Sequence, residues 1–294
     1  MSSNYERNDR KAGKKQVFQK RPEGRLDRPS KGSERGPRTA EAAPRVGRGK
    51  PEADNFLWGR HPVLAALANP ARRGMGRLMA TEERAAEIER DGLAHGHRIE
   101  VVDVQALTRL LPAGAVHQGL AFKVQPLEGV DLRDLAEPAE GLIVMLDQLT
   151  DPQNVGAIFR SALAFGARGI VVQDRHAPAL AGALAKAAVG ATERLPHARV
   201  TNLSRALETL AEYGWRAVGL DGDAEHTLEQ ALDHRPTVLV MGSEGDGVRR
   251  LVAEHCEVMA RIPMPGGFES LNVSNAAAVA LYEAARAQGH KPAG

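Results

Sequence analysis

Several residue types and motifs that mark common classes of protein are rare or missing in this chain of 294 residues. Its single cysteine, Cys256, excludes an intramolecular disulfide framework and fits a reducing compartment, so we expect a cytoplasmic protein. Aromatic residues make up 4% of the chain, which argues against binding single strands by base stacking. Because no apolar run reaches about 18 residues and the N-terminus lacks a signal-peptide core, we expect no membrane association.

The usual nucleotide, metal and hydrolase motifs are missing as well. The chain has no G-x-x-x-x-G-K-[ST] loop, no H-E-x-x-H and no C-x-x-C, and its histidines are scattered, so we expect no metal site. Gly242, Gly245 and Gly247 have the wrong spacing for a dinucleotide fingerprint. Ser243 and Ser270 lack the G-x-S-x-G context of a serine hydrolase. Together these absences favour a reaction that needs no metal.

Charge is distributed unevenly along the chain. Residues 1–50 carry 15 Lys and Arg against 6 Asp and Glu, a net charge of +9, whereas the remainder carries 24 against 31, a net charge of −7. A basic tail on a mildly acidic body is often found in proteins that contact nucleic acid, although a solubilising extension has the same composition. Residues 1–54 also lack any hydrophobic period, and we predict that they are disordered.

Residues 55–125 predict a small α/β unit in which short strands alternate with helices. Its strand candidates are Arg77–Ala80, 99–102 and 119–124, and its helix candidates are 82–95 and 104–111, the second capped by Asp103. At the start of the unit Leu57, Val63, Leu64 and Leu67 fall at helical spacing, with Pro62 in the first turn. A linker with two prolines, 126–140, separates this unit from the next.

Residues 141–290 predict a second and larger α/β unit. Leu142–Leu146 is an apolar run typical of a strand buried on both faces, and Asp151 and Pro152 begin a helix that Gly166 ends. Strand and helix candidates alternate from there to the terminal alanine-rich helix, which predicts a mostly parallel sheet. The predicted fold class is therefore α/β.

Five polar residues of this second unit are candidates for chemistry. Asn154 and Arg160 lie within two turns of one predicted helix, and Glu244 lies between glycines in a loop that follows a strand. Ser270 and Asn272 follow the last strand. Loops with small and polar residues at the ends of parallel strands are typical of a ligand site.

Each of these residues also has a purely structural interpretation. Asn154 and Arg160 fit a solvent-facing helix surface, and Glu244 fits an exposed turn. Ser270 and Asn272 would cap the terminal helix, although Ser274 or Asn275 would fit that position better. The residue types alone leave both interpretations open.

Three blocks of sequence, in this order, resemble the three motifs of the SpoU/TrmH branch of the SPOUT RNA methyltransferases. They are NVGAIFRSA (154–162), MGSEGDGV (241–248) and IPMPGGFESLNVS (262–274). Residues 55–125 resemble the L30e-like RNA-binding domain of the same family, including His117-Gln118-Gly119 near their end. The arrangement is most similar to family members that methylate a guanosine of 23S rRNA.

The resemblance implies methylation of a ribose 2′-hydroxyl in RNA, with S-adenosylmethionine as cofactor, a C-terminal trefoil knot and a homodimer. The catalytic positions that it implies are Asn154, Arg160, Glu244, Ser270 and Asn272. The cofactor-binding positions that it implies are Leu220, Gly242, Ile262 and Leu271. Two alternatives stay open at this point, namely a transfer RNA substrate and a non-catalytic RNA-binding or ribosome assembly factor.

Arg160 is the catalytic arginine that the resemblance implies. A sulfonium is already an activated leaving group, so the enzyme mainly aligns the reactants, an effect of about 7–11 kcal/mol in favourable cases. A guanidinium is a poor base because its pKa lies above about 12. We therefore expect Arg160 to orient the hydroxyl and the phosphate, and the proton acceptor stays open.

Overall fold

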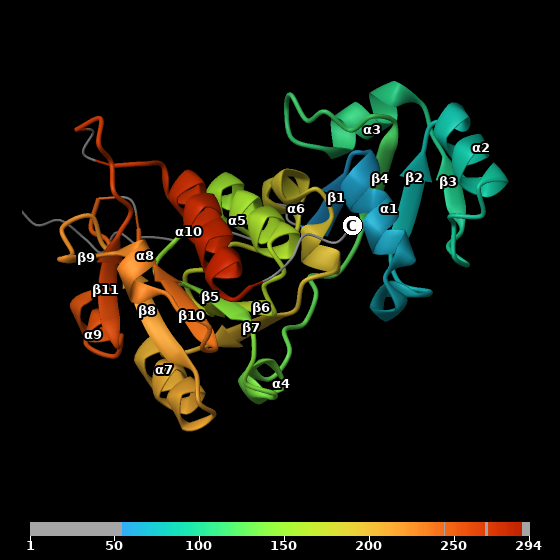
Figure 1. The fold of residues 1–294 in the computed structure, drawn as a ribbon. Helices are drawn as coiled ribbons and strands as arrows, with labels where there is room; N and C mark the ends of the chain where they lie inside the picture. The colour runs from blue at the N-terminus through green and yellow to red at the C-terminus, as the bar shows by residue number, and fades with distance from the viewer. Residues whose placement is uncertain (1–54, 244, 268–269, 290–294) are drawn as a thin grey trace, which may run out of the picture. The chain divides into compact units, whose positions relative to one another are not determined.

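The computed structural model describes residues 55–243, 245–267 and 270–289. The predicted disordered tail, residues 1–54, lies outside this range. None of the helices in the described ranges is long and apolar enough to cross a membrane. The strands of the described residues form two sheets (Figure 1).

The N-terminal sheet has four strands in the order β1-β4-β2-β3. The strands are β1 (Phe56–Trp58), β2 (Arg77–Ala80), β3 (Ile99–Val101) and β4 (Leu120–Lys123). The helices are α1 (Arg60–Ala68), α2 (Glu82–Arg90), α3 (Val104–Leu110) and the 3₁₀ turn η2 (Pro70–Arg72). β2 has the predicted bounds, and Asp103 caps α3 as predicted, since its carboxylate accepts from the Ala106 amide at 2.6 Å.

The start of this sheet corrects the helical spacing predicted from Leu57 onward. Phe56–Trp58 form a strand whose three residues are all buried, and α1 begins only after Gly59, which has a φ of 85°. β1 pairs antiparallel with β4, so that Leu57 lies opposite Phe122. A strand partner that is distant in the sequence therefore overrides the local periodicity.

The C-terminal sheet has seven strands in the order β7-β6-β5-β10-β8-β11-β9, and each neighbouring pair is parallel. The strands are β5 (Leu142–Leu146), β6 (Gly169–Gln173), β7 (His197–Val200), β8 (Arg216–Leu220), β9 (His226–Thr227), β10 (Thr237–Met241) and β11 (Val258–Arg261). The predicted α/β fold with a mostly parallel sheet is confirmed. β5 has the predicted bounds, whereas the two-residue β9 adds a strand to the prediction.

Helices cover both faces of this sheet. One face carries α5 (Pro152–Ala164), α6 (Gly182–Ala188), α8 (Leu228–Ala231) and α10 (Val273–Ala287). The other face carries α4 (Leu132–Ala136), α7 (Leu203–Glu212) and α9 (Arg250–Ala253). The 3₁₀ turn η3 (Ala191–Glu193) follows α6, and α4 forms a short helix inside the segment predicted as a linker.

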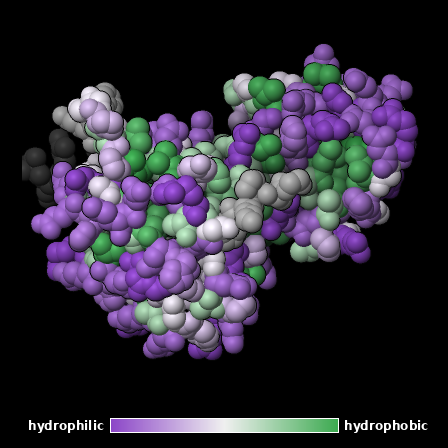
Figure 2. Space-filling model, in the orientation of Figure 1, coloured by the Kyte–Doolittle hydropathy of each residue, from purple (hydrophilic) through white to green (hydrophobic). Residues whose placement is uncertain are grey.

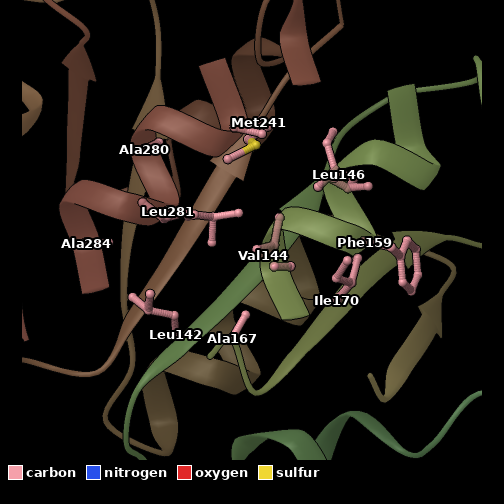
Figure 3. Close-up of a cluster of buried hydrophobic side chains, with 14 of the residues drawn as sticks. Leu142, Val144, Leu146, Phe159, Ala167, Ile170, Met241, Ala280, Leu281 and Ala284 are labelled. Carbon is pink, nitrogen blue, oxygen red and sulfur yellow. The ribbon is translucent and has the colours of Figure 1, made fainter. Parts of the chain in front are cut away.

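Strand β5 contributes side chains to two hydrophobic cores. Leu142, Val144 and Leu146 join the core under α5 and α10, where Figure 3 shows them, and Ile143 and Met145 join the core under α7. This alternation explains why every residue of the strand is apolar and buried. The two cores fix β5 in the interior of the sheet, between β6 and β10, and Leu149 of the loop that follows it joins the first core.

His197, at the start of β7, makes the stability of this domain depend on pH. Its side chain is buried beside Phe159, and burial together with Arg199 lowers its pKa to about 4 from the ordinary 6.5. As pH falls, His197 is therefore protonated in the unfolded chain before it is protonated in the folded protein. The free energy of unfolding falls as pH drops from about 6.5 to about 4. Between pH 7.5 and pH 5 we expect the free energy of unfolding to fall by about 2 kcal/mol from this group.

Urea unfolding of the wild type and of His197→Phe at both pH values measures this contribution. The variant should lose about 2 kcal/mol less than the wild type on acidification. An equal loss in both proteins would show that His197 does not carry the effect.

Candidate active site

The site lies where neighbouring strands of the parallel sheet end at the same edge. Met241, the last residue of β10, pairs with Leu146, the last residue of β5. On the other side of β10, β8 ends at Leu220, and Leu220 pairs with Ala260 of β11. The loops that follow these four strands therefore open at one edge, which is where ligands bind in open α/β sheets.

Helix α5 starts at this edge and carries two of the predicted catalytic residues. The Asp151 side chain accepts from the amides of Gln153 and Asn154 at 3.3 and 3.0 Å, and Pro152 occupies the first turn, as predicted. Asn154 is half-buried in the first turn, and Arg160 lies exposed further along the helix. Capping thus fixes where α5 begins and where Asn154 lies.

Asn272 joins the last loop to helix α5. Its Nδ2 donates to Oδ1 of Asn154 at 3.1 Å, across 118 positions of sequence. Its Oδ1 accepts from the amide and the hydroxyl of Ser274 at 3.0 and 2.6 Å, so Asn272 is the cap of α10. The expectation that Ser274 or Asn275 would fit the cap position better was wrong. The hydrogen bond to Asn154 and the capping bond together set the orientation of the Asn272 amide.

Of the four predicted cofactor residues, Leu220 is the last residue of β8, and the other three lie in the loops after β10 and β11. Leu220 and Ile262 are half-buried against the core under α5 and α10. Leu271 is 39% exposed, which leaves an aliphatic surface open for contact. Gly242 is buried, and a Cβ atom added there would overlap backbone atoms of Gly247 and Val248. Leu220 thus ends β8, and Gly242 and Ile262 directly follow the adjacent strands β10 and β11.

The segment 242–248, here called the cofactor loop after the cofactor contact predicted for Gly242, turns sharply after β10. Ser243 and Gly247 exchange two backbone hydrogen bonds, both of 3.1 Å. Gly245 and Gly247 have φ values of 99° and 65°, a backbone region that glycine adopts without strain. Glu244, a predicted catalytic residue, lies outside the described residues.

Two of the predicted catalytic residues are in direct contact with each other, and two others are exposed at the surface. Asn154 and Asn272 are hydrogen-bonded, whereas Arg160 and Ser270 are exposed. The sequence did not single out Asp147 and Arg249, which form an ion pair in which the Asp147 side chain is fully buried and the Arg249 side chain is 38% exposed. A single acid directly after an all-apolar strand was the signal that could have pointed to Asp147.

Family models match both parts of the described chain. The model of the SpoU rRNA Methylase family covers residues 141–282. A second model, described as RNA 2′-O ribose methyltransferase substrate binding, covers residues 56–130. The two matches contain the C-terminal and the N-terminal sheet, respectively.

Individual proteins agree with these models. An uncharacterised tRNA/rRNA methyltransferase from Synechocystis is 39% identical over 248 residues, which are 81% of this chain and 64% of that protein. The 23S rRNA (guanosine-2′-O-)-methyltransferase RlmB of Xylella fastidiosa is 39% identical over 242 residues, or 79% of this chain and 96% of that protein. The crystal structure of the SpoU methyltransferase AviRb from Streptomyces viridochromogenes with AdoMet matches with a TM-score of 0.64 and 27% identity, covering 79% of this chain and 89% of that one. By its motifs, fold and relatives, the chain belongs to the SpoU rRNA methylase family.

Proposed function

We propose that this RNA methyltransferase transfers the methyl group of S-adenosylmethionine to the 2′-hydroxyl of a guanosine in 23S rRNA. The observation that carries the proposal is the Asn154–Asn272 hydrogen bond, which joins the first and third motifs beside three adjacent strand ends. The name of the Xylella relative supports a guanosine of 23S rRNA as the target.

The residues at the strand ends fit a bound S-adenosylmethionine. At Gly242 the backbone is packed too closely against Gly247 and Val248 for any side chain, and in this proposal its polar backbone groups would contact the ligand. Leu220, Ile262 and Leu271 would cover the apolar faces of the adenine. When bound, the cofactor supplies a methyl group that its positive sulfur has already activated.

The remaining candidate residues would act on the ribose. The exposed Arg160 would form charge-assisted hydrogen bonds to the phosphate beside the target nucleotide and orient its hydroxyl. Asn154 and Asn272 would position the neighbouring loops, with Ser270 and Glu244 as further contacts. Since a guanidinium is a poor base, this assignment makes Arg160 an orienting group.

The N-terminal parts of the chain would supply most of the affinity for RNA. Residues 55–125 would be the L30e-like substrate-binding domain, whose exposed arginines include Arg73, Arg98 and Arg109. The basic tail, 1–54, would add contacts to phosphates that do not depend on sequence. We further propose that the protein acts in the cytoplasm, which fits its single cysteine.

We also propose a trefoil knot in the C-terminal domain. The strand order supports it, because the connections from β9 to β10 and from β10 to β11 both cross β8. After β11 the chain returns to pack α10 against α5 and β10. Two successive crossovers followed by a return are compatible with a knotted path.

We propose in addition a homodimer that uses the exposed face of α10. Val279 and Tyr282 are 43% and 58% exposed, and the Tyr282 ring packs edge-on against Phe165 at 5.9 Å. Figure 2 shows apolar surface in the region of α10 and α5. A second copy of the chain would cover these side chains.

Tyr282→Asp should therefore turn the dimer into a monomer. An unpaired carboxylate inside an interface costs about 2–5 kcal/mol, enough to dissociate the protein at micromolar concentration. Light scattering coupled to size exclusion measures the mass directly. Val116→Asp, which alters an equally exposed apolar residue of the N-terminal part, should stay dimeric. A dimeric Tyr282→Asp variant would exclude this face.

Mapping ribose methylation tests the function itself. A 2′-O-methylated nucleotide resists alkaline cleavage because the hydroxyl that would attack the next phosphate is blocked. Total RNA from cells with and without the protein should differ at one guanosine of 23S rRNA. A difference only in transfer RNA would identify transfer RNA as the substrate. The absence of any difference would refute the enzymatic proposal.

A further inference from the structure

We infer that Asp147 and Arg249 position the cofactor loop for S-adenosylmethionine, although neither residue belongs to the three sequence motifs. Asp147 follows β5 directly, and its side chain is fully buried, with an exposed fraction of 0%. A buried carboxylate is costly unless a close partner compensates its charge. In this case one residue provides that compensation.

Arg249 contacts both carboxylate oxygens of Asp147. Its Nε and Nη2 lie 2.8 and 2.6 Å from Oδ1, and its backbone amide donates to Oδ2 at 2.9 Å. Nη2 of Arg249 also donates to Oε1 of Gln173, at the end of β6, at 3.1 Å. The guanidinium is therefore held between the ends of two neighbouring strands.

These contacts fasten the cofactor loop at both of its ends to the same residue. Before the loop, the Asp147 amide donates to the carbonyl oxygen of Met241 at 2.8 Å. After the loop, the Asp147 carboxylate holds Arg249. Gly242, whose backbone leaves no room for a side chain, lies directly beside the first attachment. The ion pair thus helps to fix the distance between the two ends of the loop. It thereby helps to fix the position of the Gly242 backbone.

The inference rests on the proposal that this loop contacts S-adenosylmethionine. Asp147 and Arg249 are positioning residues in this interpretation, because they would act through the loop and touch neither reactant. Loss of the pair should therefore weaken cofactor binding more than it weakens RNA binding.

Asp147→Asn and Arg249→Gln test the inference by calorimetric titration of S-adenosylmethionine into the protein without RNA. Each change should raise the dissociation constant about tenfold or more, and the double variant should be no worse than either single one, because both remove one interaction. Arg249→Lys keeps the charge but not the paired geometry and should recover only part of the affinity. The KM for RNA should change by less than about twofold in every variant.

Glu193→Gln is the matched control for destabilisation alone. Glu193 pairs with Arg72 at 2.7 Å, and their side chains are 1% and 4% exposed, so this pair is as deeply buried as Asp147. Its loss should lower the melting temperature but leave the dissociation constant of S-adenosylmethionine at the wild-type value. If Asp147→Asn does not fold, the comparison uses Arg249→Gln, whose side chain is 38% exposed and whose backbone contact to Asp147 is kept.

The outcomes separate the inference from the proposed function. A wild-type protein that binds no S-adenosylmethionine would refute the function. Wild-type affinity in Asp147→Asn and Arg249→Gln would overturn the inference and leave the function standing. An equal loss of affinity in Glu193→Gln would also overturn the inference, since it would reduce the effect to general destabilisation.

Discussion

Arg160→Ala should lose turnover and keep its cofactor. If Arg160 orients the ribose hydroxyl and phosphate, removing its guanidinium takes away an interaction of the transition state, and kcat should fall about 10²–10³-fold. Because Arg160 is exposed on α5 and is not among the residues predicted to bind the cofactor, the dissociation constant for S-adenosylmethionine should stay within about twofold of wild type. Single-turnover methylation of 23S rRNA with labelled cofactor measures the first quantity and calorimetry the second.

The matched control for this variant is Arg205→Ala. Arg205 is also an exposed helical arginine, but it lies on α7, which packs on the opposite face of the sheet. Its loss removes the same charge and should leave kcat unchanged. Near-normal turnover in Arg160→Ala would reject the assignment, and an equal decrease in both variants would point to net charge as the cause.

Gly242→Ala should strongly weaken cofactor binding. The added methyl group would overlap backbone atoms of Gly247 and Val248, so the cofactor loop must move away from the end of β10. Backbone atoms cannot move aside as easily as the end of a long, flexible side chain. We therefore expect the dissociation constant for S-adenosylmethionine to rise about 100-fold, or about 3 kcal/mol. Calorimetry together with a melting curve distinguishes lost binding from lost folding.

Gly222→Ala provides the comparison for this prediction. Gly222 follows β8 at the same edge of the sheet, yet a Cβ added there meets no atom of the described residues within 4 Å. Its backbone does not adopt a positive φ either. Unchanged binding in Gly222→Ala and lost binding in Gly242→Ala would attribute the effect to the cofactor loop. Wild-type affinity in Gly242→Ala would mean that this loop does not contact the cofactor.

Local chemistry made a large part of the fold predictable. The all-apolar run Leu142–Leu146 is strand β5, and Asp151 with Pro152 begins α5, because burial on two faces and helix capping both act within a few residues. For the same reason Asp103 could be recognised as the cap of α3. Such signals need no knowledge of distant partners.

Other parts depended on contacts between distant residues and could not be predicted. The strand Phe56–Trp58 exists because β4 pairs with it, and the two-residue β9 exists because β11 pairs with it. Asn272 was not preferred as the cap of α10, since its additional hydrogen bond to Asn154 has no local signature. The ion pair of Asp147 with Arg249 likewise spans 102 positions. Sequence named the candidate residues of the site, whereas their contacts required the fold.

The position of β10 in the sheet bears on how the chain is synthesised. β10 inserts between β5 and β8, so one edge of β5 stays open until Thr237–Met241 has left the ribosome. During that interval β5, β6 and β7 present an apolar strand edge, the kind of surface that other chains can join. The nascent protein must therefore remain protected at this edge until residues 237–241 have emerged.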